Sequence, residues 1–218
     1  MSTFASAYRR IVGHAALVLL LTALTASTGV AQEGQEAAQD TQAGTNVVRV
    51  FTGFQHVFKR VLTEDAAVIL VPGPIGADGF SAYQNLPGAG PGNGALGLVT
   101  GQGSLINVRF TAESQCAGGG ADAGWCGVRI LVNGVEAQPA PADFAFDSTN
   151  NGAEGGASWE GHAMDRHICI RNPNPGTSFA VPVQVQWRVF AGANPATVPQ
   201  FWLDDWSLTI ETAVASCQ

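Results

Sequence analysis

Apolar and polar residues alternate with a period of two along several stretches from residue 105 onward. The clearest stretch covers residues 105–113, where the apolar positions include Ile106, Val108, Phe110 and Ala112. The same alternation recurs over residues 128–132, 181–189 and 206–211. Because successive side chains of a strand point to opposite faces, each stretch predicts a β-strand with one buried face.

Turn signals separate these stretches. Asn133-Gly134 lies between Val132 and Val135 and predicts a two-residue hairpin, because a type I′ turn needs positive φ at both central positions. Shorter apolar runs at residues 47–51, 54–62 and 67–71 predict further strands. No stretch combines a 3.6-residue period with helix caps, so we expect little helix.

Strands with one apolar face need a second layer to cover that face. Residues 46–218 are therefore predicted to form one all-β domain, a two-sheet antiparallel β-sandwich that is jelly-roll-like and has roughly 8 to 10 strands. The composition agrees with this fold class, since 27 glycines and 11 prolines among 218 residues argue against a helical bundle.

The first 45 residues follow a different pattern. Arg9 and Arg10 precede an apolar run and small residues follow at 29–31, so residues 1–31 are predicted to be a cleaved secretory signal peptide. A membrane anchor is the alternative, but the apolar run is shorter than the roughly 20 residues that span a bilayer. Residues 32–45 predict a flexible linker. We expect a secreted protein, periplasmic or extracellular, without a membrane span after cleavage.

The charge balance excludes one class of partner. The chain carries 10 Lys and Arg residues against 17 Asp and Glu residues. Cleavage removes Arg9 and Arg10 and no acid, which leaves 8 basic residues against 17 acidic ones, a net charge of −9. Such a chain is a poor partner for phosphate backbones, so no nucleic-acid binding is expected.

All four cysteines, Cys116, Cys126, Cys169 and Cys217, follow the predicted signal peptide. Exported proteins meet an oxidising compartment, so two disulfides are expected, and three pairings are possible in principle. We favour Cys116 with Cys126, as the staple of a local hairpin, and Cys169 with Cys217, which would tie the last strand to the fold. The alternative of a zinc ribbon does not fit the spacing.

Two motifs carry a resemblance to a known group of proteins. The first runs from Cys116 to Trp125-Cys126-Gly127-Val128-Arg129-Ile130, and the second is Leu203-Asp204-Asp205-Trp206-Ser207-Leu208-Thr209-Ile210-Glu211. Together they resemble a family of uncharacterised secreted bacterial β-sandwich proteins, over residues 104–211. The resemblance implies export and a β-sandwich, and it carries over no catalytic residue.

The tryptophans suggest a binding role. Trp187 and Trp206 fall on the apolar faces of predicted strands and are predicted core residues. Trp125 and Trp159 are less well explained by a core, and exposed indoles stack on sugars in sugar-binding β-sandwiches. These two are the candidate ligand-binding residues, with disulfide packing or loop anchoring as the alternative roles.

The loop 143–154 offers the oxygen ligands that calcium prefers. The candidates are Asp143, Asp147, Asn150 and Glu154. Their spacing is not that of an EF-hand, so an ordinary polar loop is the alternative interpretation. No other cofactor is expected.

Motifs for catalysis are incomplete. No serine lies in a Gly-x-Ser-x-Gly motif, and His162 and His167 are spaced so that they fall on opposite faces of a strand. Glycoside hydrolysis needs only two carboxylates at a set separation, and the candidates for these are Glu160, Asp165, Asp204 and Asp205. The adjacent pair Asp204-Asp205 also fits a bulge or a strand end.

These observations favour a secreted, non-catalytic β-sandwich module that acts in extracellular binding or assembly. Its expected partners are glycans, a cell surface or further copies of itself. An extracellular carbohydrate-active hydrolase that uses paired carboxylates is the alternative function.

Overall fold

The computed structural model describes residues 56–118, 124–140, 144–150, 158–191 and 198–217. The chain divides into two units, residues 1–35 and 36–218, and every described residue belongs to the second. The predicted signal peptide, the linker and the strand at residues 47–51 lie outside the described residues. Within the described ranges, no helix has the length and apolarity needed to cross a membrane.

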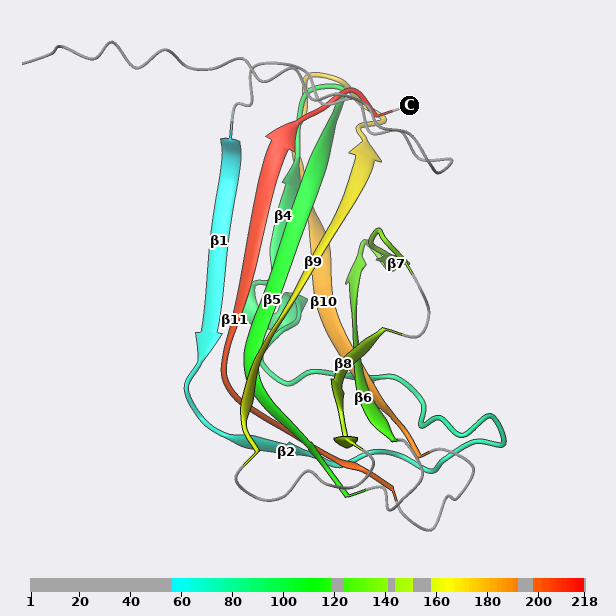
Figure 1. Ribbon diagram of the computed structural model, residues 1–218. Helices are drawn as coiled ribbons and strands as arrows, with labels where there is room; N and C mark the ends of the chain where they lie inside the picture. Colours follow the sequence, from blue (N-terminus) through cyan, green and yellow to red (C-terminus); the bar gives the residue numbers. More distant parts are fainter. Residues whose placement is uncertain (1–55, 119–123, 141–143, 151–157, 192–197, 218) are drawn as a thin grey trace, which may run out of the picture. The chain divides into compact units, whose positions relative to one another are not determined.

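The described residues form eleven strands and one short 3-10 helix, η1, at Pro91–Asn93 (Figure 1). The strands are β1 (His56–Glu64), β2 (Val68–Leu70), β3 (Gln84–Asn85), β4 (Leu96–Val99), β5 (Gly103–Ala117), β6 (Trp125–Val132), β7 (Val135–Glu136), β8 (Ala145–Ser148), β9 (Glu160–Arg171), β10 (Phe179–Phe190) and β11 (Gln200–Val214). The all-β prediction is confirmed. The strand number exceeds the predicted one because β2, β3 and β7 have only two or three residues each.

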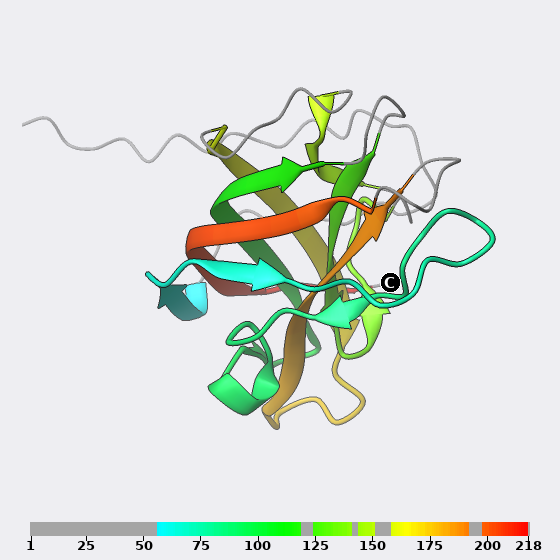
Figure 2. The ribbon, with the colours of Figure 1, turned by 90° about the horizontal axis from the view of Figure 1, so that it is seen from below.

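The strands form two antiparallel sheets. The five-stranded sheet has the order β1-β11-β5-β9, with β2 also paired to β11, as seen from the end of the molecule in Figure 2. The six-stranded sheet has the order β3-β10-β6-β7, with β4 on β10 and β8 on β6. The longer strands pass repeatedly from one sheet to the other along the chain, as in a jelly roll, which confirms the predicted sandwich.

The core lies between the two sheets and is built from the alternating strands. Ile106 and Phe110 of β5 are fully buried, and Trp187 and Trp206 are only 2% and 3% exposed, as predicted. The ring centroids of Phe110 and Trp206 lie 6.2 Å apart. The predicted hairpin is also present, because Asn133 and Gly134 have φ values of 54° and 77° and connect β6 to β7.

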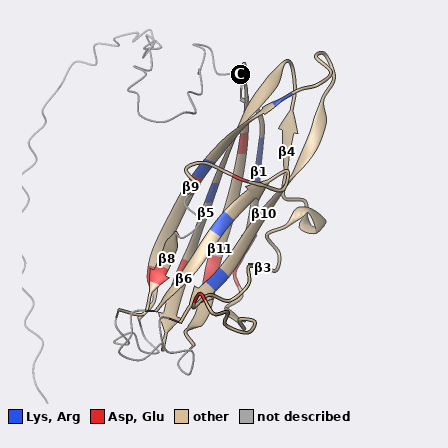
Figure 3. Ribbon diagram, turned by 90° about the vertical axis from the view of Figure 1, so that its right-hand side faces the viewer, with Lys and Arg blue, Asp and Glu red and all other residues tan. Residues whose placement is uncertain are grey.

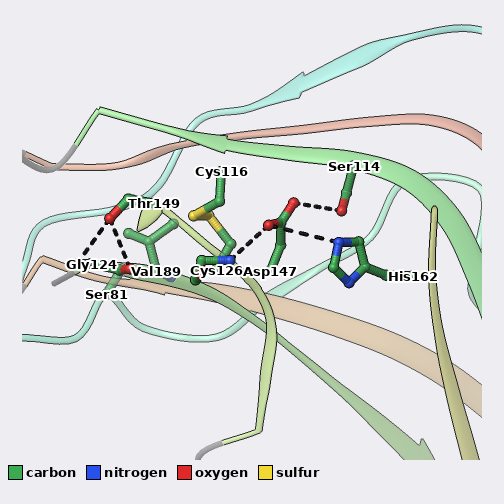
Figure 4. Close-up of a disulfide and its surroundings, with 10 residues drawn as sticks. Ser81, Ser114, Cys116, Gly124, Cys126, Asp147, Thr149, His162 and Val189 are labelled. Carbon is green, nitrogen blue, oxygen red and sulfur yellow. Dashed lines mark hydrogen bonds and ion pairs between the residues drawn. A yellow bond between two sulfur atoms is a disulfide. The ribbon is translucent and has the colours of Figure 1, made fainter. Parts of the chain in front are cut away.

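Both favoured disulfides form, but one has a different role from the predicted one. Cys116 lies on β5 and Cys126 on β6, so their bond joins the two sheets and is not the staple of a hairpin (Figure 4). β5 and β6 belong to different sheets, which spacing along the chain does not reveal. The second disulfide joins Cys169 of β9 to Cys217, which follows β11.

Candidate functional site

A β-bulge in β11 determines which side chains reach the outer face of the five-stranded sheet. Asp204 pairs with Glu113 and Ser207 pairs with Thr111, so two residues of β11 oppose a single residue of β5. Asp205 has a φ of 44°, and its N–H donates to Oδ1 of Asp204 at 3.0 Å. The bulge expected at this acidic pair is therefore present.

The extra residue reverses the alternation along β11. After the bulge, Trp206 and Leu208 face the core, and before it Phe201 and Leu203 do. Trp202 lies between Phe201 and Leu203 and therefore points to the outer face. Without the bulge, Trp202 would share the face of Trp206 and would be a core residue.

Trp202 belongs to a row of side chains that crosses the outer face. It pairs with Ile69 of β2 on one side and with Gln115 of β5 on the other. Trp159, one residue before β9, meets Trp202 edge to face, with ring centroids 6.5 Å apart and an interplanar angle of 90°. Both indoles are partly exposed, whereas Gln115 of the intervening strand is only 3% exposed. Ile69 is 49% exposed, so the row ends in an open apolar side chain.

A row of acidic groups lies next to the indoles. Asp204 faces Glu113 across β11 and β5, and Glu113 faces Gly161 of β9. Among the described residues, no Lys, Arg or His nitrogen forms an ion pair with either carboxylate. A Cβ added at Gly161 would meet nothing within 4 Å, so the surface beside Glu113 is open. We call Trp159, Trp202, Glu113 and Asp204 the indole–acid site.

The other candidate tryptophan, Trp125, lies on the outer face of the six-stranded sheet. Its ring packs against Phe80 and Phe190, with centroids 5.4 and 5.6 Å away. It also lies over Gly127, where an added Cβ would be 2.6 Å from the indole. The guanidinium of Arg188 stacks on the Phe80 ring, 3.8 Å from its centroid. We call Trp125, Phe80, Phe190 and Arg188 the Trp125 cluster. Figure 3 shows in blue the Lys and Arg positions, which include those of β6 and β10.

A polar groove of about 410 Å³ lies elsewhere on the outer face of the five-stranded sheet. Two ion pairs line it, Lys59 with Glu211 at 2.9 Å and Arg109 with both carboxylate oxygens of Asp165 at 2.7 and 3.2 Å. The hydrogen bond to Asp165 raises the pKa of Arg109 above its usual range. Asp165, a candidate hydrolase carboxylate, is therefore already engaged by Arg109. His167 also lines this groove.

Asp147 points into the sandwich (Figure 4). Its carboxylate is 2% exposed and accepts hydrogen bonds from the Ser114 hydroxyl at 2.6 Å and the Ser148 N–H at 2.7 Å. Nε2 of His162 lies 3.9 Å from Asp147 and 3.4 Å from Glu160. His162 thus faces inward, on the side of β9 opposite the groove, as its spacing from the second histidine predicted. The Ser114 hydroxyl donates a hydrogen bond to this carboxylate and is fully buried, so it is not positioned to attack a substrate as a nucleophile.

The calcium candidates are divided between described and undescribed residues. Asp143 and Glu154 lie outside the described residues. Asp147 is engaged by Ser114, and Asn150 is exposed. The described ranges contain no group of three or more acidic, histidine or cysteine side chains that could hold a metal ion. The calcium site stays a prediction.

Sequence patterns had not indicated two of the four residues in the indole–acid site, Trp202 and Glu113. One signal was present: Phe201 and Leu203 alternate in the opposite phase to Trp206 and the residues after it. A phase change in a strand marks an inserted residue, and this one turns Trp202 outward.

A scan against models of known protein families and a search of curated proteins both find no match to this chain.

Proposed function

We propose that the protein is a secreted, non-catalytic β-sandwich module that binds glycans through the indole–acid site. The two disulfides fit an oxidising compartment outside the cytoplasm, in agreement with the predicted signal peptide and with the resemblance to secreted bacterial proteins. The observation that carries the proposal is the pair of partly exposed indoles, Trp159 and Trp202, on the outer face of a sheet.

The chemistry of this pair suits a sugar. A pyranose ring has apolar C–H faces that pack on an indole and hydroxyl groups that need hydrogen-bond acceptors. Glu113 and Asp204 supply carboxylate oxygens beside the rings, and Gly161 leaves the surface next to them open. Specific small-molecule sites combine such apolar contacts with a few well-placed polar groups.

The test is glycan binding by residues 32–218, first on a glycan array and then by calorimetry with the best ligand. Trp202→Ala and Trp159→Ala are each expected to weaken binding about 30-fold, as for an interface residue worth about 2 kcal/mol. Trp202→Phe keeps an aromatic ring and should keep most of the affinity. Trp125→Ala removes an indole from the opposite outer face and should leave affinity unchanged. Unaltered binding in both Trp159→Ala and Trp202→Ala would contradict the proposal.

An extracellular hydrolase is the second candidate. Glu113 and Asp204 are directly opposed on neighbouring strands, so both carboxylates lie on the same outer face, and glycoside hydrolysis needs two carboxylates near each other. Chromatography of oligosaccharides incubated with the protein tests this function. Hydrolysis is supported if shorter products are released by the parent protein and by neither Asp204→Asn nor Glu113→Gln. It is contradicted if the oligosaccharides stay intact after long incubation.

Assembly is a third role, favoured by the exposed apolar chain at the end of the indole row. Ile69 is 49% exposed, and a second copy of the protein could cover it together with Trp202. Light scattering after size-exclusion chromatography gives the molar mass of residues 32–218. A closed oligomer that dissociates with Ile69→Ser would assign this face to assembly, whereas a monomer leaves it open for a ligand.

A further inference from the structure

We infer that the ligand of the indole–acid site carries a positive charge, as the ammonium group of a sugar with a free amine does. This inference rests on the proposed function and names the class of glycan. Its starting point is the local charge: Glu113 and Asp204 face each other on the outer surface, and the exposed Asp205 follows directly in the bulge.

The placement of these acids has an electrostatic cost. Carboxylates directly opposite on neighbouring strands repel each other and destabilise a sheet. Two other acids on the same face have basic partners, in the pairs Lys59 with Glu211 and Arg109 with Asp165. Among the described residues, neither Glu113 nor Asp204 has such a partner. A cation supplied by a ligand would remove the repulsion.

The indoles point independently to the same charge. The face of an indole attracts cations more strongly than any other aromatic side chain. Trp202 and Asp204 are two residues apart on one face of β11, which is about 7 Å along the strand. A pyranose ring packed on an indole can therefore place an amine next to the carboxylates. The Trp125 cluster lacks this combination, because there a guanidinium already covers the Phe80 ring.

The inference separates two kinds of amino sugar. A glucosamine unit with a free amine is protonated in mildly acidic buffer and offers both an apolar ring face and a cation. Its N-acetylated counterpart has nearly the same ring but no charge, so it keeps the stacking and loses the attraction. Polyuronic acids carry negative charge and are repelled by Glu113 and Asp204.

The experiment compares two oligomers of equal length, glucosamine and N-acetylglucosamine, titrated into residues 32–218 at about pH 6 with a chelator present. The N-acetylated oligomer should bind about tenfold more weakly, the size of one cation–π or ion-pair contact. Glu113→Gln and Asp204→Asn should each lower the affinity for the glucosamine oligomer about fivefold. Each should change the affinity for the N-acetylglucosamine oligomer by less than about twofold. Glu211→Gln, an acid on the same face that is paired with Lys59, should change neither affinity.

The other outcomes are distinct. Equal binding of both oligomers that still depends on Trp202 would overturn the charge inference and leave the proposed function standing. Equal binding of both oligomers that appears only when calcium replaces the chelator would also overturn it. If no glycan, neutral or charged, is retained, the proposed function fails and the inference fails with it.

Discussion

The two outer faces of the sandwich each carry an aromatic group, and the two groups are built differently. In the Trp125 cluster the indole contacts two phenylalanine rings and lies over a glycine, and an arginine stacks on one of those rings. In the indole–acid site, the described residues give Trp202 a single ring contact, with Trp159. The charged neighbours there are carboxylates that have no basic partner within the described ranges.

This difference separates a group that stabilises the protein from a group that is available to a ligand. Aromatic contacts inside the Trp125 cluster are made within the chain, and the cation that would sit on a ring is the chain's own Arg188. Among the described residues, the indole–acid site has fewer aromatic ring contacts, and its two carboxylates form no ion pair with a basic residue, so both kinds of group are available to a ligand. Substitutions in the Trp125 cluster should therefore mainly lower stability, and substitutions in the indole–acid site should mainly weaken ligand binding.

The largest expected effect comes from the two tryptophans. Trp125→Ala should lower the free energy of unfolding by about 3 kcal/mol, because it removes two aromatic contacts and opens a gap over Gly127. Trp202→Ala should lower it by about 1 kcal/mol, because one aromatic contact is lost. Urea unfolding followed by fluorescence or circular dichroism measures both. Similar losses for the two variants would contradict the division of roles.

The next effect comes from two glycines on the outer faces. Gly127→Ala places a Cβ 2.6 Å from the Trp125 indole and should cost about 2 kcal/mol, as overpacking does. Gly161→Ala meets nothing within 4 Å and should change stability by less than about 0.5 kcal/mol. The matched pair is measured by the same urea unfolding. Because Gly161 lies beside Glu113, Gly161→Ala should instead reduce glycan affinity, and a stable variant with full affinity would place the ligand elsewhere.

The bulge that turns Trp202 outward gives the third prediction. Asp205 has a φ of 44°, a conformation that costs a β-branched residue about 1 to 2 kcal/mol and costs glycine nothing. Asp205→Val should therefore lower the free energy of unfolding by about 1.5 kcal/mol, whereas Asp205→Gly should leave it unchanged or raise it slightly. Urea unfolding of both variants is the measurement, and equal stability would show that the bulge does not need this backbone conformation.

Much of the fold could be predicted from local patterns. A period of two requires only that one face of each strand is buried, so the strand at residues 105–113 and its partners were predictable, and Asn133-Gly134 identified the hairpin. Local patterns do not say which sheet a strand joins. For that reason the Cys116–Cys126 bond was expected within a hairpin and was found between the sheets.

The candidate site was only partly predictable for a related physical reason. Trp159 stood out because no core strand explained it, and Asp204-Asp205 indicated a bulge. The contact between Trp159 and Trp202 depends on the registers of β11 with β5 and of β5 with β9, strands that are distant in the sequence. Glu113 looked like an ordinary outward residue of a strand, and its importance comes from the acid opposite it on β11.

The smallest expected effect has an unusual sign. Removing a surface charge usually leaves stability unchanged or lowers it, but Glu113→Gln ends a repulsion with Asp204 and should raise the free energy of unfolding by about 0.5 kcal/mol. The gain should shrink in about 0.5 M salt, because exposed charges are screened there. Glu211→Gln removes the partner of Lys59 and should give no gain at either salt concentration. If Glu113→Gln is no more stable than the parent protein in dilute buffer, the two carboxylates do not repel each other, and the expectation of a cationic ligand at the indole–acid site rests on the indoles alone.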